Sequence, residues 1–245
     1  MKRSRYLPVI VLFALAALLT TGCDALIAST GGTRGSGNVI SETRDVSGFT
    51  VIELNTSGNA VVTVGDVDSL TIEAEDNILP LLTSEVRNGV LVLGTEPNSS
   101  FSSTRNIIYT ITVANLDAVT LNGSGNLTAG TLAGEQMVIA VNGSGSVDIA
   151  DVSGNDLTVT ISGSGSVTVA GSVTSQDVHI LGSGGYNGFD LASNSATIVT
   201  DGSGNAQVNV ADTLDATSNG SGSVIYAGGP QVNAATNGSG DVRAR

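Results

Sequence analysis

Apolar and polar residues alternate along most of the chain, and the alternation continues through a recurring Gly-Ser-Gly motif. Around one copy the odd-numbered positions hold Leu157, Val159, Ile161, Gly163, Gly165, Val167 and Val169. A period of two is typical of a β-strand with one buried face. The two glycines occupy buried positions, and Ser164 between them faces outward. We therefore predict a strand that bends at each motif, with glycine inside because the bend is too narrow for side chains.

The motif recurs at a nearly constant interval. It starts at Gly123, Gly143, Gly163, Gly182, Gly202, Gly220 and Gly238, in steps of 20, 20, 19, 20, 18 and 18 residues. Such a period indicates stacked structural units. Coils of 18–20 residues, at roughly 3.3 Å per residue, fit an all-β parallel β-helix (β-solenoid) with two or three short strands per turn. An antiparallel hairpin array is the alternative, but it does not require the alternation to run through all seven motifs.

Stacked coils place equivalent residues above one another. The outward serines form one predicted ladder: Ser124, Ser144, Ser164, Ser183, Ser203, Ser221 and Ser239. The residues before each motif form a second: Asn122, Asn142, Ser162, Leu181, Asp201, Asn219 and Asn237. Stacked amides and hydroxyls can form hydrogen bonds along the coil axis. Except for Leu181, these residues make up our candidate ligand-binding surface.

The segment before residue 115 alternates without a clear repeat. Weaker copies of the motif occur at 35–38 (GSGN) and 56–59 (TSGN). The pairs Gly65-Asp66 and Asn88-Gly89 indicate turns between strands, and Asn-Gly is the stronger hairpin signal. The sequence therefore predicts a less regular β-helix over residues 38–114 and regular coils over 115–245.

Four segments in this order carry a family resemblance: VSGFTVI at 46–52, LTIEAEDN at 70–77, NGVL at 88–91 and LNGSG at 121–125. They resemble the bacterial auto-transporter adhesin, head GIN domain family, over about residues 38–245. The resemblance implies a right-handed parallel β-helix in an exported or lipid-anchored protein. The family has no agreed function or catalytic residues, so the resemblance assigns none here.

The first residues predict export. Lys2, Arg3 and Arg5 precede an apolar stretch at 8–19, which has the length of a signal-peptide core. Gly22-Cys23 then resembles a bacterial lipoprotein signal, and Cys23 is the only cysteine. We predict a signal peptide over 1–22, a lipid on Cys23 and a flexible tether over 23–37. The expected location is the periplasmic side of a membrane or the cell surface.

Charge and residue types narrow the function. The formal net charge of -13 disfavours binding to nucleic acid. Neither a cofactor nor a metal site is predicted: a calcium-like turn at 184–191 carries an extra residue and does not repeat. The single histidine, His179, lies between inward-facing residues and should face solvent. We therefore predict a non-catalytic, adhesin-like or scaffold protein that binds a glycan or protein, with a polysaccharide-acting enzyme as the alternative. The sequence does not indicate an oligomeric state.

Overall fold

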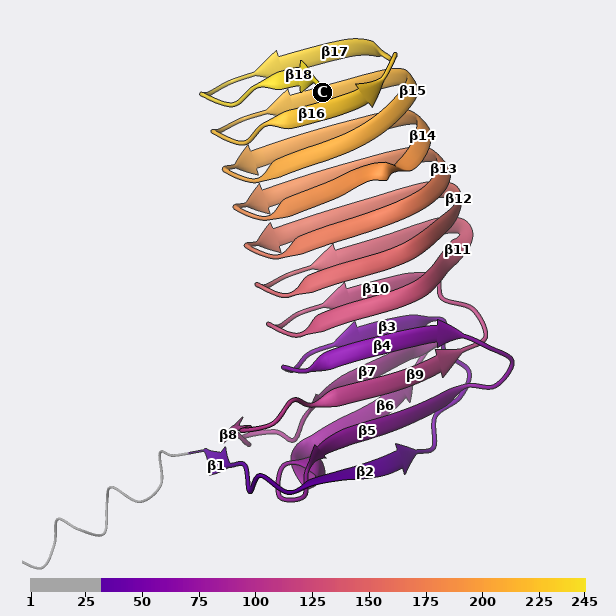
Figure 1. Cartoon of the computed structure of the whole chain (residues 1–245), viewed down its shortest axis with the longest axis vertical. Helices are drawn as coiled ribbons and strands as arrows, with labels where there is room; N and C mark the ends of the chain where they lie inside the picture. Colours follow the sequence, from indigo (N-terminus) through magenta and orange to yellow (C-terminus); the bar gives the residue numbers. More distant parts are fainter. Residues whose placement is uncertain (1–31) are drawn as a thin grey trace, which may run out of the picture.

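The computed structural model describes residues 32–245, which form one column of stacked strands (Figure 1). The predicted signal peptide and Cys23 lie outside the described residues. The regular coils contain β10 (Ala118–Leu121), β11 (Asn126–Val141), β12 (Ser146–Gly163), β13 (Ser166–Gly182), β14 (Gly185–Gly202), β15 (Asn205–Ser218), β16 (Val224–Gly228), β17 (Gln231–Thr236) and β18 (Val242–Ala244). No helix among the described residues is long and apolar enough to cross a membrane.

Each long strand runs along one face of the column and returns along the other. In β12, residues 146–149 pair with residues 166–169 of β13, and residues 156–163 pair with residues 175–182. Every pair between the regular coils is parallel. The predicted parallel β-helix is therefore confirmed, and the antiparallel alternative is wrong for these coils.

The predicted alternation is confirmed around the motif at 163–165. Leu157, Val159, Ile161, Val167 and Val169 are all buried, whereas Ser164 is exposed. A narrow bend is only part of the reason for glycine. A Cβ atom on Gly165 would lie 2.5 Å from Val141 Cγ1 and also 2.5 Å from the carbonyl oxygen of Gly145 in the coil below. The stacking of successive backbones therefore excludes side chains from this column.

The N-terminal half has a different chain order. It contains β1 (Thr33–Arg34), β2 (Val39–Arg44), β3 (Val51–Leu54), β4 (Asn59–Val64), β5 (Ser69–Glu75), the 3-10 helix η1 (Leu79–Leu81), β6 (Leu82–Arg87), β7 (Val90–Thr95), β8 (Phe101–Ser102) and β9 (Ile108–Val113). Strands β3 and β4 lie between two layers that follow them in sequence. They pair with β10 and β11 on one side and with β7 and β9 on the other.

Antiparallel pairs close the N-terminal end of the column. Strands β6 and β7 form a hairpin, and β5 pairs antiparallel with both β2 and β9. Asn88 and Gly89 both have positive φ angles, of 52° and 81°, at the two-residue turn of the hairpin. Two such residues favour a hairpin turn that matches the strand twist. The hairpin predicted from Asn88-Gly89 is confirmed, although the parallel fold predicted from residue 38 applies only to part of this half.

Residues 33–37, predicted to belong to the flexible tether, are held in place. Strand β1 pairs with β8, and the Gly37 N–H donates to Glu75 Oε1 at 2.7 Å. Ser36 Oγ donates to Asp76 Oδ1 at 2.5 Å. The early GSGN copy therefore binds the corner after β5 and is not a coil bend. By contrast, the copy at 56–59 does stack beneath the motif at 123–125.

Candidate ligand-binding edge

The exposed serines of the bends form one continuous row, which we call the Ser edge. All seven predicted serines are exposed, and Ser57 of the early copy lies below them. The row follows the left margin of Figure 1, where β11 to β15 end. The Ser edge comprises Ser57, Ser124, Ser144, Ser164, Ser183, Ser203, Ser221 and Ser239. Among the residues described, none of these hydroxyls forms a side-chain hydrogen bond within the protein, so each keeps its donor and acceptor capacity.

The neighbouring Asn row differs because its amides bind one another. Asn142 Nδ2 donates to Asn122 Oδ1 at 2.7 Å, and Asn122 Nδ2 donates to Asn55 Oδ1 at 2.6 Å. The contacts resume where Asn219 Nδ2 donates to Asp201 Oδ1 at 2.7 Å and Asn237 Nδ2 donates to Asn219 Oδ1 at 2.9 Å. The Asn row therefore connects coils to each other, whereas the Ser edge faces outward with its hydroxyls available.

Register explains why the Asn row is interrupted. Ser162 pairs with Leu181, which pairs with Asp201. Leu181 is 47% exposed and cannot continue an amide ladder.

A further row of polar residues, on the other side of the motif, was not predicted as part of the surface. Here Asn126 Nδ2 donates to Asn59 Oδ1 at 3.1 Å, and Ser146 Oγ donates to Asn126 Oδ1 at 2.6 Å. The 20-residue spacing of Asn126 and Ser146 could have revealed it.

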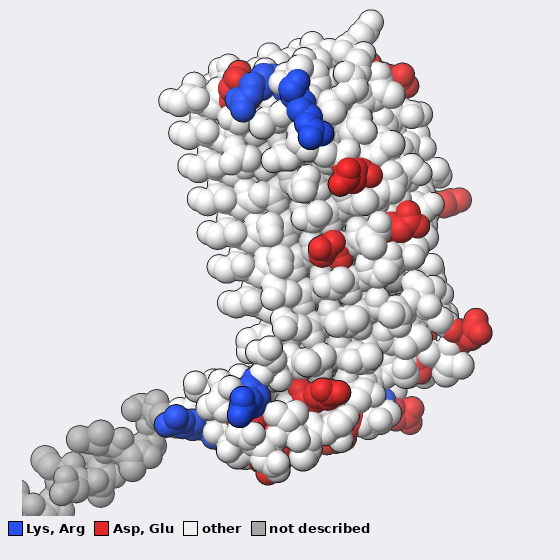
Figure 2. Space-filling view, viewed as in Figure 1, with Lys and Arg blue, Asp and Glu red and all other residues white. Residues whose placement is uncertain are grey.

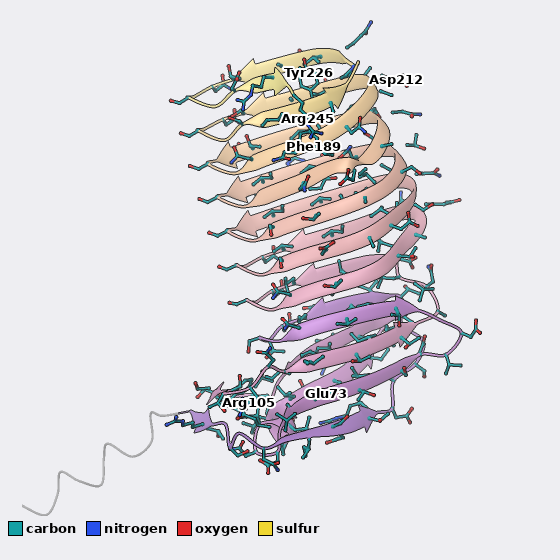
Figure 3. All side chains as sticks on the ribbon, in the orientation of Figure 1. Glu73, Arg105, Phe189, Asp212, Tyr226 and Arg245 are labelled. Carbon is teal, nitrogen blue, oxygen red and sulfur yellow. The ribbon has the colours of Figure 1, made fainter. Side chains whose placement is uncertain are left out.

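A pocket lies at the base of the Ser edge, and we call it the basal pocket. Its volume is about 230 Å³. Ser57 and Ser124 of the Ser edge belong to its wall, so the row of hydroxyls leads directly into it. The pocket is lined by Ser57, Gly58, Asn59, Ser103, Thr104, Arg105, Asn106, Ile107, Ser124 and Gly125. Figure 3 shows Arg105 at the lower left, below the edge formed by the bends.

The segment between β8 and β9 supplies half of the pocket and is held by a buried carboxylate. Glu75 is only 1% exposed. It accepts hydrogen bonds from Thr104 N at 2.9 Å, from Thr104 Oγ1 at 2.6 Å and from Gly37 N at 2.7 Å. These bonds, led by that of the Thr104 hydroxyl, lower the pKa of Glu75 below its ordinary value of 4.5. The alternating pattern did not predict this contribution, because the pocket segment is not a repeat.

Two acidic residues line a second cavity, on the N-terminal half. It has a volume of about 520 Å³, and its lining includes Glu85 and Glu96 together with Arg87. Glu85 forms an ion pair with Arg87. His179 faces the surface as predicted, with its side chain 43% exposed and Nε2 3.2 Å from Asp177 Oδ1.

Residues 185–191 of the calcium-like turn at 184–191 are part of β14. The register between β13 and β14 shifts between Thr168 and Ala170, which accommodates the extra residue as a bulge. Within residues 32–245, no group of three or more His, Cys, Asp and Glu side chains is arranged to hold a metal ion.

A family model described as "putative auto-transporter adhesin, head GIN domain" matches residues 48–230. The chain belongs to this family. The matched range includes the whole basal pocket and the Ser edge up to Ser221, so the candidate site is part of the head GIN domain. Membership of an adhesin-like family supports an exported protein of the cell envelope.

Solved structures share the same fold. A putative adhesin from Bacteroides fragilis is 26% identical, with 87% of this chain and 100% of that chain covered, at a TM-score of 0.83. A putative lipid binding protein from Parabacteroides distasonis is 23% identical, with 86% and 98% covered, at a TM-score of 0.72. A putative adhesin from Parabacteroides merdae is 21% identical, with 87% and 98% covered, at a TM-score of 0.67. The last two similarities show the fold alone. No curated protein matches the chain.

Proposed function

We propose that this head GIN domain protein is a non-catalytic, adhesin-like module that binds a glycan along the Ser edge and in the basal pocket. The observation that carries the proposal is the row of exposed hydroxyls that form no side-chain hydrogen bond within residues 32–245 and that leads into a polar pocket. Sugar hydroxyls both donate and accept hydrogen bonds, as serine hydroxyls do. A regular row along a rigid column presents such groups at a repeated spacing, which suits a chain of similar sugar units.

A glycan array tests the proposal with matched variants of the full chain. The double variant Ser124→Ala and Ser144→Ala removes two hydroxyls of the Ser edge. Ser153→Ala and Ser172→Ala remove two exposed hydroxyls that pair in register elsewhere in the coils. Loss of two hydrogen bonds of about 1 kcal/mol each should weaken binding roughly tenfold or more in the first variant only. Equal effects, or no glycan bound by the unchanged protein, would contradict the proposal. A protein ligand lost in the first variant would keep the surface and change the ligand class.

We also propose that Cys23 carries the lipid that anchors the protein to the envelope. The support is the apolar stretch followed by Gly22-Cys23 and the absence of any other cysteine from the sequence. Cells grown with labelled palmitate should label the unchanged protein and not Cys23→Ala. Equal labelling of both would contradict the anchor without affecting the glycan proposal.

The cavity lined by Glu85 and Glu96 is the observation that favours a polysaccharide-acting enzyme. Glycosidases need one protonated and one ionised carboxyl group across the scissile bond. In this cavity Glu85 pairs with Arg87, and Glu96 is the second carboxyl group of the lining. Hydrolysis of an envelope polysaccharide that is abolished by both Glu85→Gln and Glu96→Gln would establish this alternative. No hydrolysis by the unchanged protein would exclude it for the polysaccharides tested.

A further inference from the structure

We propose that the basal pocket selects the carboxylate of a terminal acidic sugar through Arg105. This inference rests on the proposed glycan-binding function and names the class of sugar that the pocket accepts. The six arginines of the described residues are Arg34, Arg44, Arg87, Arg105, Arg243 and Arg245, and the only lysine of the sequence, Lys2, lies outside them.

Four of the six arginines are already engaged. Arg44 Nε lies 2.8 Å from Glu42 Oε1, Arg87 pairs with Glu85, and Arg243 Nη1 lies 3.4 Å from Asp241 Oδ2. Arg245 packs over a ring, with Cζ 4.7 Å from the centroid of Phe189. Within residues 32–245, the guanidinium groups of Arg34 and Arg105 form no ion pair with a carboxylate, although the backbone N–H of Arg105 donates a hydrogen bond to Glu75. Arg34 belongs to β1, which pairs with β8, and Arg105 follows β8 by three residues. Figure 2 shows two basic patches at the lower left of the column.

Arg105 lines a preformed pocket. The residue before it, Thr104, is fixed by two hydrogen bonds to Glu75, so the backbone that carries the guanidinium group is held in place. Glu75 is the carboxylate beneath this segment, and it is satisfied by hydrogen bonds from Gly37 and Thr104. The guanidinium group is a strong partner for a carboxylate, and serine hydroxyls and asparagine amides around it are partners for sugar hydroxyls. The pocket therefore combines one positive charge with neutral polar groups.

The overall charge selects against ligands with many negative charges. At a formal net charge of -13, the protein repels polyanions and anionic membrane surfaces over distances up to about 10 Å at moderate salt. A single carboxylate at the end of an otherwise neutral glycan is repelled less than a polyanion and can still reach Arg105. Its hydroxyls can contact Ser57 and Ser124 at the start of the Ser edge. A terminal acidic sugar is therefore the ligand class that fits the basal pocket.

Paired probes test the inference in calorimetric titrations. The full chain is titrated with sialyllactose, with its methyl ester and with lactose. A charge-assisted hydrogen bond of about 1.5–3 kcal/mol predicts at least roughly tenfold tighter binding of the acid than of the ester. Arg105→Gln should remove this preference, so that the acid and the ester bind with equal affinity. Arg87→Gln, a change at an arginine of the second cavity, should keep the preference.

The outcomes separate this inference from the proposed function. If the unchanged protein binds acid and ester equally, or if Arg105→Gln retains the preference, the inference is wrong. The proposed function survives that result when binding still depends on Ser124 and Ser144. A glucuronic-acid-terminated oligosaccharide and its glucose-terminated counterpart repeat the test with a second acidic sugar. Binding to phosphatidylglycerol vesicles that needs Arg105, without binding to any of the sugars, would overturn the inference in favour of a membrane surface.

Discussion

The two halves of the column use glycine for different physical reasons. In the regular coils, Gly165 has no positive φ angle, but a Cβ atom on it would lie 2.5 Å from the carbonyl oxygen of Gly145, so the stacking of coils requires glycine there. In the N-terminal half, Gly37, Gly48 and Gly89 have open space around the Cβ position but positive φ angles of 84°, 73° and 81°. There, glycine serves single turns. The regular coils repeat one requirement, the lack of space for a Cβ atom between stacked backbones. In the N-terminal half, each of these glycines instead provides the positive φ angle of its own turn.

This difference determines how each half tolerates change. A residue of a regular coil contacts its own equivalent in the next coil, so one requirement appears in the sequence every 18–20 residues. A residue of the N-terminal half contacts unrelated residues, as Ile52 does between Leu91 and Val119. The candidate site combines both kinds of region. The Ser edge comes from the repeats, and half of the basal pocket comes from the segment between β8 and β9.

The largest expected effect tests the inward and outward assignment in the regular coils. Val167→Asp places an unpaired charge at a fully buried position and should lower the free energy of unfolding by about 4 kcal/mol or more. Ser164→Asp changes an exposed position and should alter it by no more than about 0.5 kcal/mol. Urea unfolding followed by circular dichroism measures both. Similar losses in the two variants would disprove the alternation on which the coils were predicted.

Glycine substitutions test the contrast between the halves. Gly165→Ala brings a Cβ atom against the backbone of the coil below and should lower the free energy of unfolding by about 3 kcal/mol. Gly89→Ala should lower the free energy of unfolding by only about 1 kcal/mol. The alanine would have to adopt a positive φ angle, but its Cβ atom would contact no other residue. Thermal unfolding of both proteins provides the comparison.

Asparagine provides the control for those two substitutions. Because asparagine tolerates positive φ, Gly89→Asn should recover part of the stability lost in Gly89→Ala. Gly165→Asn should recover none, because its Cβ atom meets the same oxygen of Gly145. If Asn rescues position 165 as well, close stacking is not the reason for glycine there.

The sequence predicted the regular half well because equivalent residues of stacked coils face the same packing requirement. That requirement therefore recurs in the sequence at a nearly constant interval. Coil length, buried positions such as Val167 and the exposed serines all followed from that period. Chain order in the N-terminal half did not follow, because alternation identifies the buried face of a strand but not its neighbour. Arg105 was missed for a related reason: it lies on a segment without a repeat, and only the fold brings it to Ser124.

A more local effect tests how the N-terminal half holds the basal pocket. Hydrogen bonds lower the pKa of Glu75 below 4.5 in the folded protein, so they stabilise the fold above that pH. This stabilisation should be lost as the pH falls below 4.5 through the folded-state pKa. Hydrogen exchange should then show faster exchange of the Gly37 and Thr104 amides, while the amides of β12 and β13 remain protected.

The variant Glu75→Gln tests whether Glu75, and not another acidic residue, causes the faster exchange at low pH. The variant should expose the Gly37 amide already at neutral pH, since the new amide group lacks the charge and one acceptor oxygen. Its exchange rate should then depend little on pH between 3 and 5, after correction for intrinsic exchange. Asp76, whose pKa is lowered by hydrogen bonds from Asn38 and Ser36, remains in this variant as an internal comparison. An unchanged acid response in Glu75→Gln would assign that response to Asp76 or another acid.

The smallest expected effect distinguishes the two rows along the bends. Asn142→Ala removes the donor to Asn122, an exposed contact between coils, and should lower the free energy of unfolding by about 0.5–1 kcal/mol. Ser144→Ala removes a hydroxyl without a side-chain hydrogen bond in the described residues and should leave stability unchanged within about 0.3 kcal/mol. Ligand binding should show the reverse order, because only the serine presents a free hydroxyl outward. If Ser144→Ala destabilises the protein as much as Asn142→Ala, the Ser edge is a structural ladder and loses its main argument as a binding surface.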